Sequence, residues 1–168
     1  MSSTVRFAAP WCRSLAISSA GLVVLLVMMS ALSAWQIPDA PDDAVTKALA
    51  IAAPFLMLVV TALFMVRGYR LEPGTLIVER LLWKTRVPLA GLRAASVDAK
   101  AMDASTRLLG NGGGFVFAGL MKNKRLGRYR CWVNDPARAV VLRVGARVIV
   151  VSPEDPAAFV HAIMDKPR

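Results

Sequence analysis

A run of nineteen residues without a charged side chain, Ala48 to Val66, constrains this 168-residue chain more than any other feature. An α-helix rises about 1.5 Å per residue, so a helix of this length approaches the roughly 30 Å hydrocarbon thickness of a bilayer. The run therefore predicts a membrane-spanning helix. It divides the chain into a membrane part, residues 1–66, and a globular part, residues 67–168.

A second uncharged run of twenty residues, Leu15 to Ala34, precedes the first. The alternative for this run is a secretory signal peptide, but it exceeds the apolar core of about seven to fifteen residues usual in such peptides. A second span also follows it promptly. We therefore predict a helical hairpin with spans at about 15–34 and 48–66. The loop 36–47 contains two prolines and three aspartates, a composition that favours a turn in water.

The first span carries a set of small side chains on which the second helix is expected to pack. These residues are Ser14, Ala16, Ser18, Ala20 and Gly21. Pro54 lies inside the second span, where it removes one backbone donor and is expected to bend the helix against its neighbour.

Basic residues flank the outer ends of the two spans. Arg6 and Arg13 precede the first span, Arg67 and Arg70 follow the second, and the intervening loop has only Lys47. Cytoplasmic segments of membrane proteins are enriched in lysine and arginine. We therefore expect a multi-pass protein of the inner (plasma) membrane with both termini in the cytoplasm.

Residues 67–168 show short alternating apolar runs separated by turn signals, a pattern that indicates an all-β sandwich or small barrel. The expected strands are Thr75–Leu82, Trp83–Val87, Ala94–Asp98, Phe115–Leu120, Arg128–Val133, Ala139–Val144 and Arg147–Val151. The lead before the first span, residues 1–13, has no pattern. The segment 100–114 also lacks a period and ends in a glycine cluster, so a mobile loop is expected there.

The chain changes period once more after the last strand. Ser152, Pro153, Glu154 and Asp155 predict a helix start, with Ser152 as the capping residue, Pro153 at the first helical position and acids in the first turn. Apolar side chains then fall on one face of that helix, which should close the sheet. They are Phe159, Val160, Ile163 and Met164.

A small β-rich domain closed by one C-terminal helix, directly behind two spans, resembles the bacterial pleckstrin-homology (PH)-like domains of small membrane proteins. The resemblance is strongest over Tyr69–Leu92 and Val148–Ile163. It implies a membrane-anchored α+β fold with two nearly orthogonal antiparallel sheets and a capping helix. Eukaryotic relatives that bind phosphoinositides carry a basic motif between their first two strands. Here that loop, Glu72–Thr75, has no lysine or arginine, so the usual headgroup site is not expected.

The sharpest candidate site is a basic hairpin whose residues are Lys122, Lys124, Arg125, Arg128, Arg130 and Trp132. Alternation along a strand places Arg128, Arg130 and Trp132 on one face. Arginines beside a tryptophan on an open face would bind lipid phosphates. Each basic residue near an anionic leaflet contributes about 1 kcal/mol of attraction. The other interpretation is a solvated tip that keeps an edge strand from pairing with other chains.

Other function classes have little support. The whole net charge of +10 lies in residues 67–168, yet no nucleic-acid-binding motif is present. His161 is the single histidine, no nucleophile sits in a catalytic motif, and no metal-ligand spacing exists, so neither an enzyme nor a cofactor or metal site is expected. The glycines at 110–114 lack the lysine and hydroxyl pair of a phosphate loop and favour a flexible connector.

The sequence thus predicts an integral membrane protein whose PH-like domain is a binding or scaffolding module for a protein partner or for self-assembly. The alternative function is sensing of anionic lipid by the basic hairpin.

Overall fold

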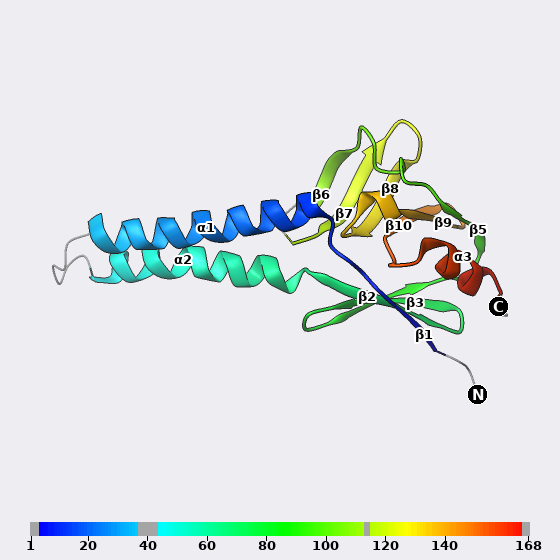
Figure 1. Cartoon of the computed structure of the whole chain (residues 1–168), viewed down its shortest axis with the longest axis horizontal. Helices are drawn as coiled ribbons and strands as arrows, with labels where there is room; N and C mark the ends of the chain where they lie inside the picture. The colour runs from blue at the N-terminus through cyan, green and yellow to red at the C-terminus, as the bar shows by residue number, and fades with distance from the viewer. Residues whose placement is uncertain (1–3, 37–43, 113–114, 166–168) are drawn as a thin grey trace.

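The computed structural model describes residues 4–36, 44–112 and 115–165. A helical hairpin extends from one end of a β-rich domain (Figure 1). Its arms are α1, Arg13–Gln36, and α2, Ala44–Leu63, and both are long and apolar enough to cross a membrane. The two predicted spans are confirmed as helices, but α2 ends three residues before Val66. The reason is that Val66 already pairs with Arg80 in a sheet.

The contact face of α1 differs from the predicted one. The small residues expected there are exposed, and the buried residues of α1 are Leu15, Ser19, Leu26 and Ser30. Ser30 donates a hydrogen bond to the carbonyl of Ile51 in α2, at 3.2 Å. Ser19 accepts one from the backbone N–H of Phe115 in the β-domain, at 2.9 Å. The prediction was wrong because α1 packs against two neighbours, and one of them lies in the β-domain.

The first sheet has four strands in the order β1-β2-β3-β4. They are β1 Val5–Ala8, β2 Val66–Glu72, β3 Thr75–Arg80 and β4 Lys84–Pro88. Strand β1 lies in the poorly patterned lead, residues 1–13, where the sequence predicted no strand. A strand of four residues shows too little alternation to be recognised, and its partner β2 follows both helices α1 and α2. The chain before α1 and the chain after α2 therefore lie in one sheet.

The second sheet has six strands in the order β5-β9-β10-β8-β7-β6. They are β5 Leu92–Val97, β6 Thr106–Gly112, β7 Phe117–Asn123, β8 Gly127–Val133, β9 Val140–Val144 and β10 Arg147–Val151. The β7–β8 and β9–β10 hairpins are confirmed. Strand β10 runs parallel to β8, however, so the expectation of purely antiparallel sheets was wrong. The β9–β10 hairpin turns back so that its second strand borders β8.

Strand β6 occupies part of the segment expected to be a mobile loop, whose last two glycines, 113–114, lie outside the described residues. Gly110 pairs with Gly119 across the β6–β7 ladder. A Cβ atom on Gly119 would lie 2.1 Å from the carbonyl oxygen of Leu109, so only glycine permits this approach. Glycine has no side chain to contribute to an alternating pattern, and the strand was missed for that reason.

The closing helix α3, Pro156–Asp165, is confirmed, but it starts later than predicted. Asp155 caps it by accepting a hydrogen bond from the N–H of Ala158, at 2.9 Å, and Pro156 is the first helical residue. Phe159 is fully buried, and its ring packs edge-on against Phe7 of β1, at a centroid distance of 5.1 Å. The helix therefore fastens the N-terminal strand to the core.

Ser152, the residue predicted to cap α3, is instead buried in a polar network. Its N–H donates to the hydroxyl of Tyr69, at 3.1 Å, and its own hydroxyl accepts from the N–H of Asn134, at 2.9 Å. The Tyr69 hydroxyl donates to the carbonyl of Trp132, at 2.5 Å. Ser152 therefore links β2 to the end of β8.

Asn134 joins the two long helices to this network. Its side-chain amide donates to the carbonyls of Ala9 and Val66, each at 2.8 Å. Ala9 lies just before α1, and Val66 lies just after α2. The backbone carbonyl of Asn134 also accepts a hydrogen bond from the backbone N–H of Cys12, at 3.3 Å. One buried residue thus holds both connections between the hairpin and the β-domain.

Replacing Asn134 with alanine leaves the buried carbonyls of Ala9 and Val66 without their donor. We expect the free energy of unfolding to fall by roughly 2–4 kcal/mol. The measurement is thermal unfolding of the full-length protein in detergent. A thiol-reactive dye reports exposure of the buried Cys131 in a Cys12→Ser background. Asn134→Asp has nearly the same shape but lacks the amide donors, so it should be at least as destabilising. Unchanged unfolding of both variants would contradict the role of Asn134.

Burial also makes stability depend on pH in the alkaline range. Loss of solvation raises the pKa of Tyr69 from 10.0 to about 12 and that of Cys131 from 9.0 to about 12. The unfolded chain therefore loses these protons at a lower pH than the folded protein does, so stability declines from about pH 9 and is lost progressively up to about pH 12. Tyr69→Phe should be less stable at pH 7 but show a shallower decline. Thermal unfolding followed by circular dichroism at pH 8, 9, 10 and 11 tests this expectation. Parallel declines of stability with pH in the wild type and Tyr69→Phe would refute the role of Tyr69.

Candidate functional site

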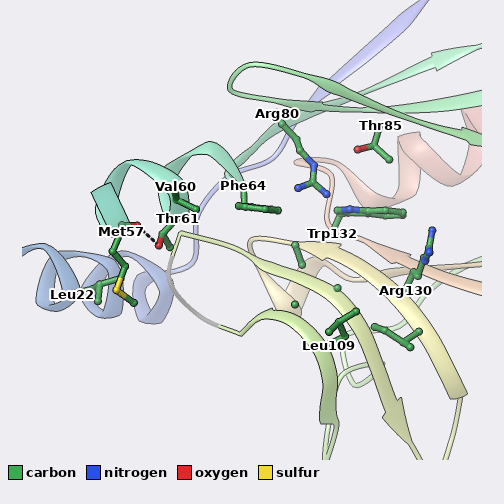
Figure 2. Close-up of a pocket in the computed structure, with 14 residues that line it drawn as sticks. Leu22, Met57, Val60, Thr61, Phe64, Arg80, Thr85, Leu109, Arg130 and Trp132 are labelled. Atoms are coloured by element: carbon green, nitrogen blue, oxygen red, sulfur yellow. Dashed lines mark hydrogen bonds between the residues drawn. The ribbon is translucent and has the colours of Figure 1, made fainter. Parts of the chain in front are cut away.

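Two adjoining cavities lie between the sheets, and the larger one extends to the helices. The larger has a volume of about 830 Å³ and the smaller about 430 Å³. They share Thr85, Leu120, Arg130 and Trp132, so we treat them as one inter-sheet cleft. Figure 2 shows the larger cavity, with Leu22 and Met57 at the helical end and Arg130 at the opposite end.

Arginine is the dominant polar residue of the cleft. The arginines that line it are Arg80, Arg86, Arg128, Arg130 and Arg147. No aspartate or glutamate is among the described residues that line either cavity. Strand alternation turns four of the five arginines toward the facing sheet, the exception being Arg86, which shares a face of β4 with Lys84. The cleft is therefore a concentrated positive site.

Arg128 and Arg147 lie especially close in the sheet. Strands β8 and β10 pair in parallel with Ile149 opposite Arg130, and this register places Arg147 beside Arg128. Neighbouring strands are about 4.8 Å apart. Both arginines are exposed, and within the described part of the chain neither forms an ion pair. Two adjacent like charges without a counter-charge repel each other, and an anion between them would remove that repulsion.

Arg80 enters the cleft from the end of β3. Its guanidinium carbon lies 5.5 Å from the ring centroids of both Phe64 and Trp83. Its Nε is buried and has no hydrogen-bond partner among the described residues. Burial also lowers the pKa of Arg80 below its ordinary value, although arginine stays protonated at neutral pH. Arg80 is thus a partly buried cation beside two aromatic rings, and its buried Nε lacks a hydrogen-bond acceptor among the described residues.

The structure divides the predicted basic hairpin into two groups. Arg128, Arg130 and Trp132 share one face of β8, as the alternation predicted, and all three line the cleft. Trp132 is only 6% exposed because it packs in the core between the sheets. It is therefore a wall of the cleft, and the open tryptophan face expected from the sequence was wrong.

The other three residues lie at the far end of the hairpin. Lys122 pairs with Arg128 across β7 and β8, and Lys124 and Arg125 form the turn beyond them. The guanidinium of Arg125 contacts the carboxylate of Asp98, at 2.7 Å, and the carbonyl of Lys100, at 3.0 Å. The opposite ends of β7 and β8 are the ones near α1. The basic turn therefore lies away from the helices, and Arg125 already has partners.

The helical end of the cleft is apolar. Leu22 of α1 and Met57, Val60 and Thr61 of α2 line the larger cavity. Met57 lies six residues before the end of α2, about 9 Å along the helix axis. Leu22 lies nine residues after the start of α1, about 14 Å along that axis. The cavity therefore reaches along helices that are apolar enough to cross a membrane.

Exposed apolar side chains border the cleft beside the end of α2. Leu81, Leu82 and Trp83 form the turn between β3 and β4, and Leu82 is 75% exposed. Leu109 of β6 lines the larger cavity and is 74% exposed. Large exposed apolar residues on the end of the domain nearest α1 and α2 are typical of a surface that contacts lipid or a partner.

Sequence reasoning missed Arg80 and Arg147, but the sequence contains a signal for both. In β3, Arg80 continues the face of Leu76 and Val78, and in β10, Arg147 shares the face of Ile149 and Val151. An arginine in line with core residues has to occupy a gap in the core. The alternation within a single strand, however, does not predict that β3 and β10 face each other across the cleft.

Groups with catalytic chemistry are not assembled at the cleft. His161 and Asp165 form an exposed pair on α3, with a distance of 2.7 Å between Nδ1 and Oδ2. Burial raises the pKa of the Cys131 thiol to about 12, so it is a poor nucleophile. The described residues contain no group of three histidine, cysteine or acidic side chains placed to hold a metal.

Comparison with known proteins identifies the family of the globular part of the chain. No curated protein matches the sequence. The family model of the bacterial PH domain matches residues 67–166, which is more than half of the chain. Two sheets closed by a C-terminal helix are the architecture that this family implies. The chain therefore belongs to the bacterial PH domain family.

Proposed function

We propose that this protein is an integral inner-membrane protein with both termini in the cytoplasm, and that its PH domain binds an anionic ligand in the inter-sheet cleft. PH domains are typically non-catalytic modules that bind proteins or lipids. The two apolar helices and the basic residues that flank them support the membrane placement. Strand β1 supports an uncleaved N-terminus, because removal of the first apolar run with the residues before it, as a signal peptide, would take away a strand of the first sheet.

The observation that carries the proposal is the set of four arginines that face the cleft without a described carboxylate among the lining residues. Guanidinium groups donate paired hydrogen bonds to phosphate and carboxylate, and such charge-assisted bonds are about twice as strong as neutral ones. The absence of basic residues from the loop between β2 and β3 is consistent with a site in the cleft. The same charges make a neutral ligand a poor fit.

The basic turn around Lys124 is a weaker candidate. It lies at the end of the β7–β8 hairpin away from the helices, and Arg125 is engaged with Asp98. We therefore assign ligand binding to Arg128 and Arg130, with Trp132 as the wall between the sheets. Lys122, Lys124 and Arg125 are assigned to a solvated tip.

A protein partner is the second candidate, and one observation favours it. Strand β4 is at the edge of the first sheet and lines the smaller cavity through Thr85, Val87 and Pro88. An edge strand offers backbone groups to an added strand, and the neighbouring arginines would select an acidic peptide. Self-assembly would use the same edge.

The topology is tested with reporter fusions in the loop after residue 40 and at the C-terminus after residue 168. Two spans with basic outer flanks should place the two fusion points on opposite sides of the membrane, with the C-terminal reporter in the cytoplasm. A periplasmic C-terminal reporter would overturn the proposed placement.

The cleft is tested with inorganic phosphate as the probe. Full-length protein in an uncharged detergent should melt at a higher temperature as phosphate is added, compared with sodium chloride at equal ionic strength. At ten times its dissociation constant a ligand stabilises the folded state by about 1.4 kcal/mol. Arg130→Gln should abolish most of this difference.

Arg143→Gln is the matched control, because Arg143 is an exposed arginine of β9 in the same sheet but on the opposite face. It loses the same charge and should retain the phosphate effect. Equal phosphate responses in Arg130→Gln and Arg143→Gln would refute the site. Binding of an acidic peptide that competes with phosphate, without retention of lipid, would favour the second candidate.

A further inference from the structure

We infer that the occupant of the cleft is a single anionic phospholipid of the surrounding leaflet, with its phosphate among the arginines and an acyl chain along the membrane helices. This inference rests on the proposed function and narrows it. A soluble anion would need only the arginine end of the cleft. The shape and composition of the larger cavity instead match an amphiphile.

The position of Arg80 along the helix axis fits the level of lipid phosphates. Phe64 is the residue directly after α2, and the Arg80 guanidinium lies against its ring. The twenty residues of α2 have a length of about 30 Å, which equals the thickness of a bilayer's hydrocarbon core. Arg80 is therefore placed at the boundary of that core, where the phosphates of the leaflet begin.

The larger cavity also offers an apolar path along the helices. From Arg80 the cavity continues past Phe64 and Val60 to Met57 and Leu22. These side chains belong to helices whose other faces would be covered by lipid tails. Figure 2 shows Met57, Val60 and Phe64 in sequence along this end of the cavity. A chain leaving the headgroup would follow mostly apolar side chains, with Thr61 as the hydroxyl-bearing residue among the helix residues that line the path.

The arginines are distributed along the cleft in a way that fits a phospholipid headgroup. Arg80 and Arg130 lie on opposite sides of Trp132 in Figure 2 and come from different sheets. Both arginines line the larger cavity, so each sheet contributes one cation to it. Arg128 and Arg147 lie farther from the helices and suit the polar part of a headgroup. A cavity of about 830 Å³ is within the range of roughly 300–1,000 Å³ usual for small-molecule sites.

The test uses full-length protein in nanodiscs made of equal amounts of phosphatidylcholine and phosphatidylglycerol. The protein is then transferred to a mild uncharged detergent, and native mass spectrometry counts the phospholipid that stays bound. We expect one phosphatidylglycerol per chain and little phosphatidylcholine. Arg130→Gln should reduce retention by about tenfold or more, since a charge-assisted hydrogen bond is worth roughly 1.5–3 kcal/mol. Arg143→Gln should retain lipid as the wild type does.

A second pair of variants separates the acyl chain from the headgroup. Val60→Trp fills the apolar path and should abolish lipid retention while leaving the phosphate-induced rise in melting temperature intact. Val59→Trp is its control, because Val59 is the neighbouring exposed residue of α2 and does not line the cavity. Val59→Trp should retain lipid.

The outcomes distinguish this inference from the proposed function. Loss of lipid in both Arg130→Gln and Val60→Trp, with retention in their controls, supports the inference. Phosphate stabilisation without lipid retention by the wild type overturns the inference and leaves the anion site in place. Equal retention in Val60→Trp and Val59→Trp also overturns it. The absence of both lipid retention and phosphate stabilisation overturns both proposals.

Discussion

The side-chain amide of Asn134 fixes the β-domain on the two apolar helices. It donates to one carbonyl before α1 and to one after α2, and its backbone is tied to Ser152 and Cys12. A buried amide with two acceptors is costly to separate, because each carbonyl would lose its partner without gaining water. These bonds hold the hairpin against the sheets at both of its connections. The place of the cleft beside the helix ends depends on this junction.

The interior of the β-domain changes character along its length. Near α3 it is a dry aromatic core, in which Phe159 packs against Phe7 and Tyr69. Toward the helices the sheets separate, and Arg80 and Arg130 occupy positions that continue core faces of their strands. Burying unpaired cations is expensive, so these groups remain tolerable only in an open cleft, beside aromatic rings or with an anion. The arrangement stabilises one end of the domain and leaves the other end available for a ligand.

Most elements follow from local patterns, and the failures have physical reasons. The uncharged runs predict the helices, and alternation predicts most strands from Thr75 onward. Strand β1 was missed because its hydrogen bonds go to a strand beyond both helices. Strand β6 was missed because close backbone contact with Gly119 requires glycine where a pattern would require side chains. The predicted role of Ser152 as a helix cap was wrong, because a serine before a proline can also hold a buried hydrogen-bond network.

The sequence by itself determined that two helices are apolar enough for a membrane, that a β-rich PH domain follows them, and that Arg128, Arg130 and Trp132 share a strand face. These properties depend on composition and on spacing within single elements. Only the tertiary structure decided which faces meet. It turned Trp132 into a wall, brought Arg80 and Arg147 to the same cleft, and left the basic turn at the far end. Alternation assigns a residue to one side of its strand, whereas a site depends on which strands face each other, and that is fixed by long-range packing.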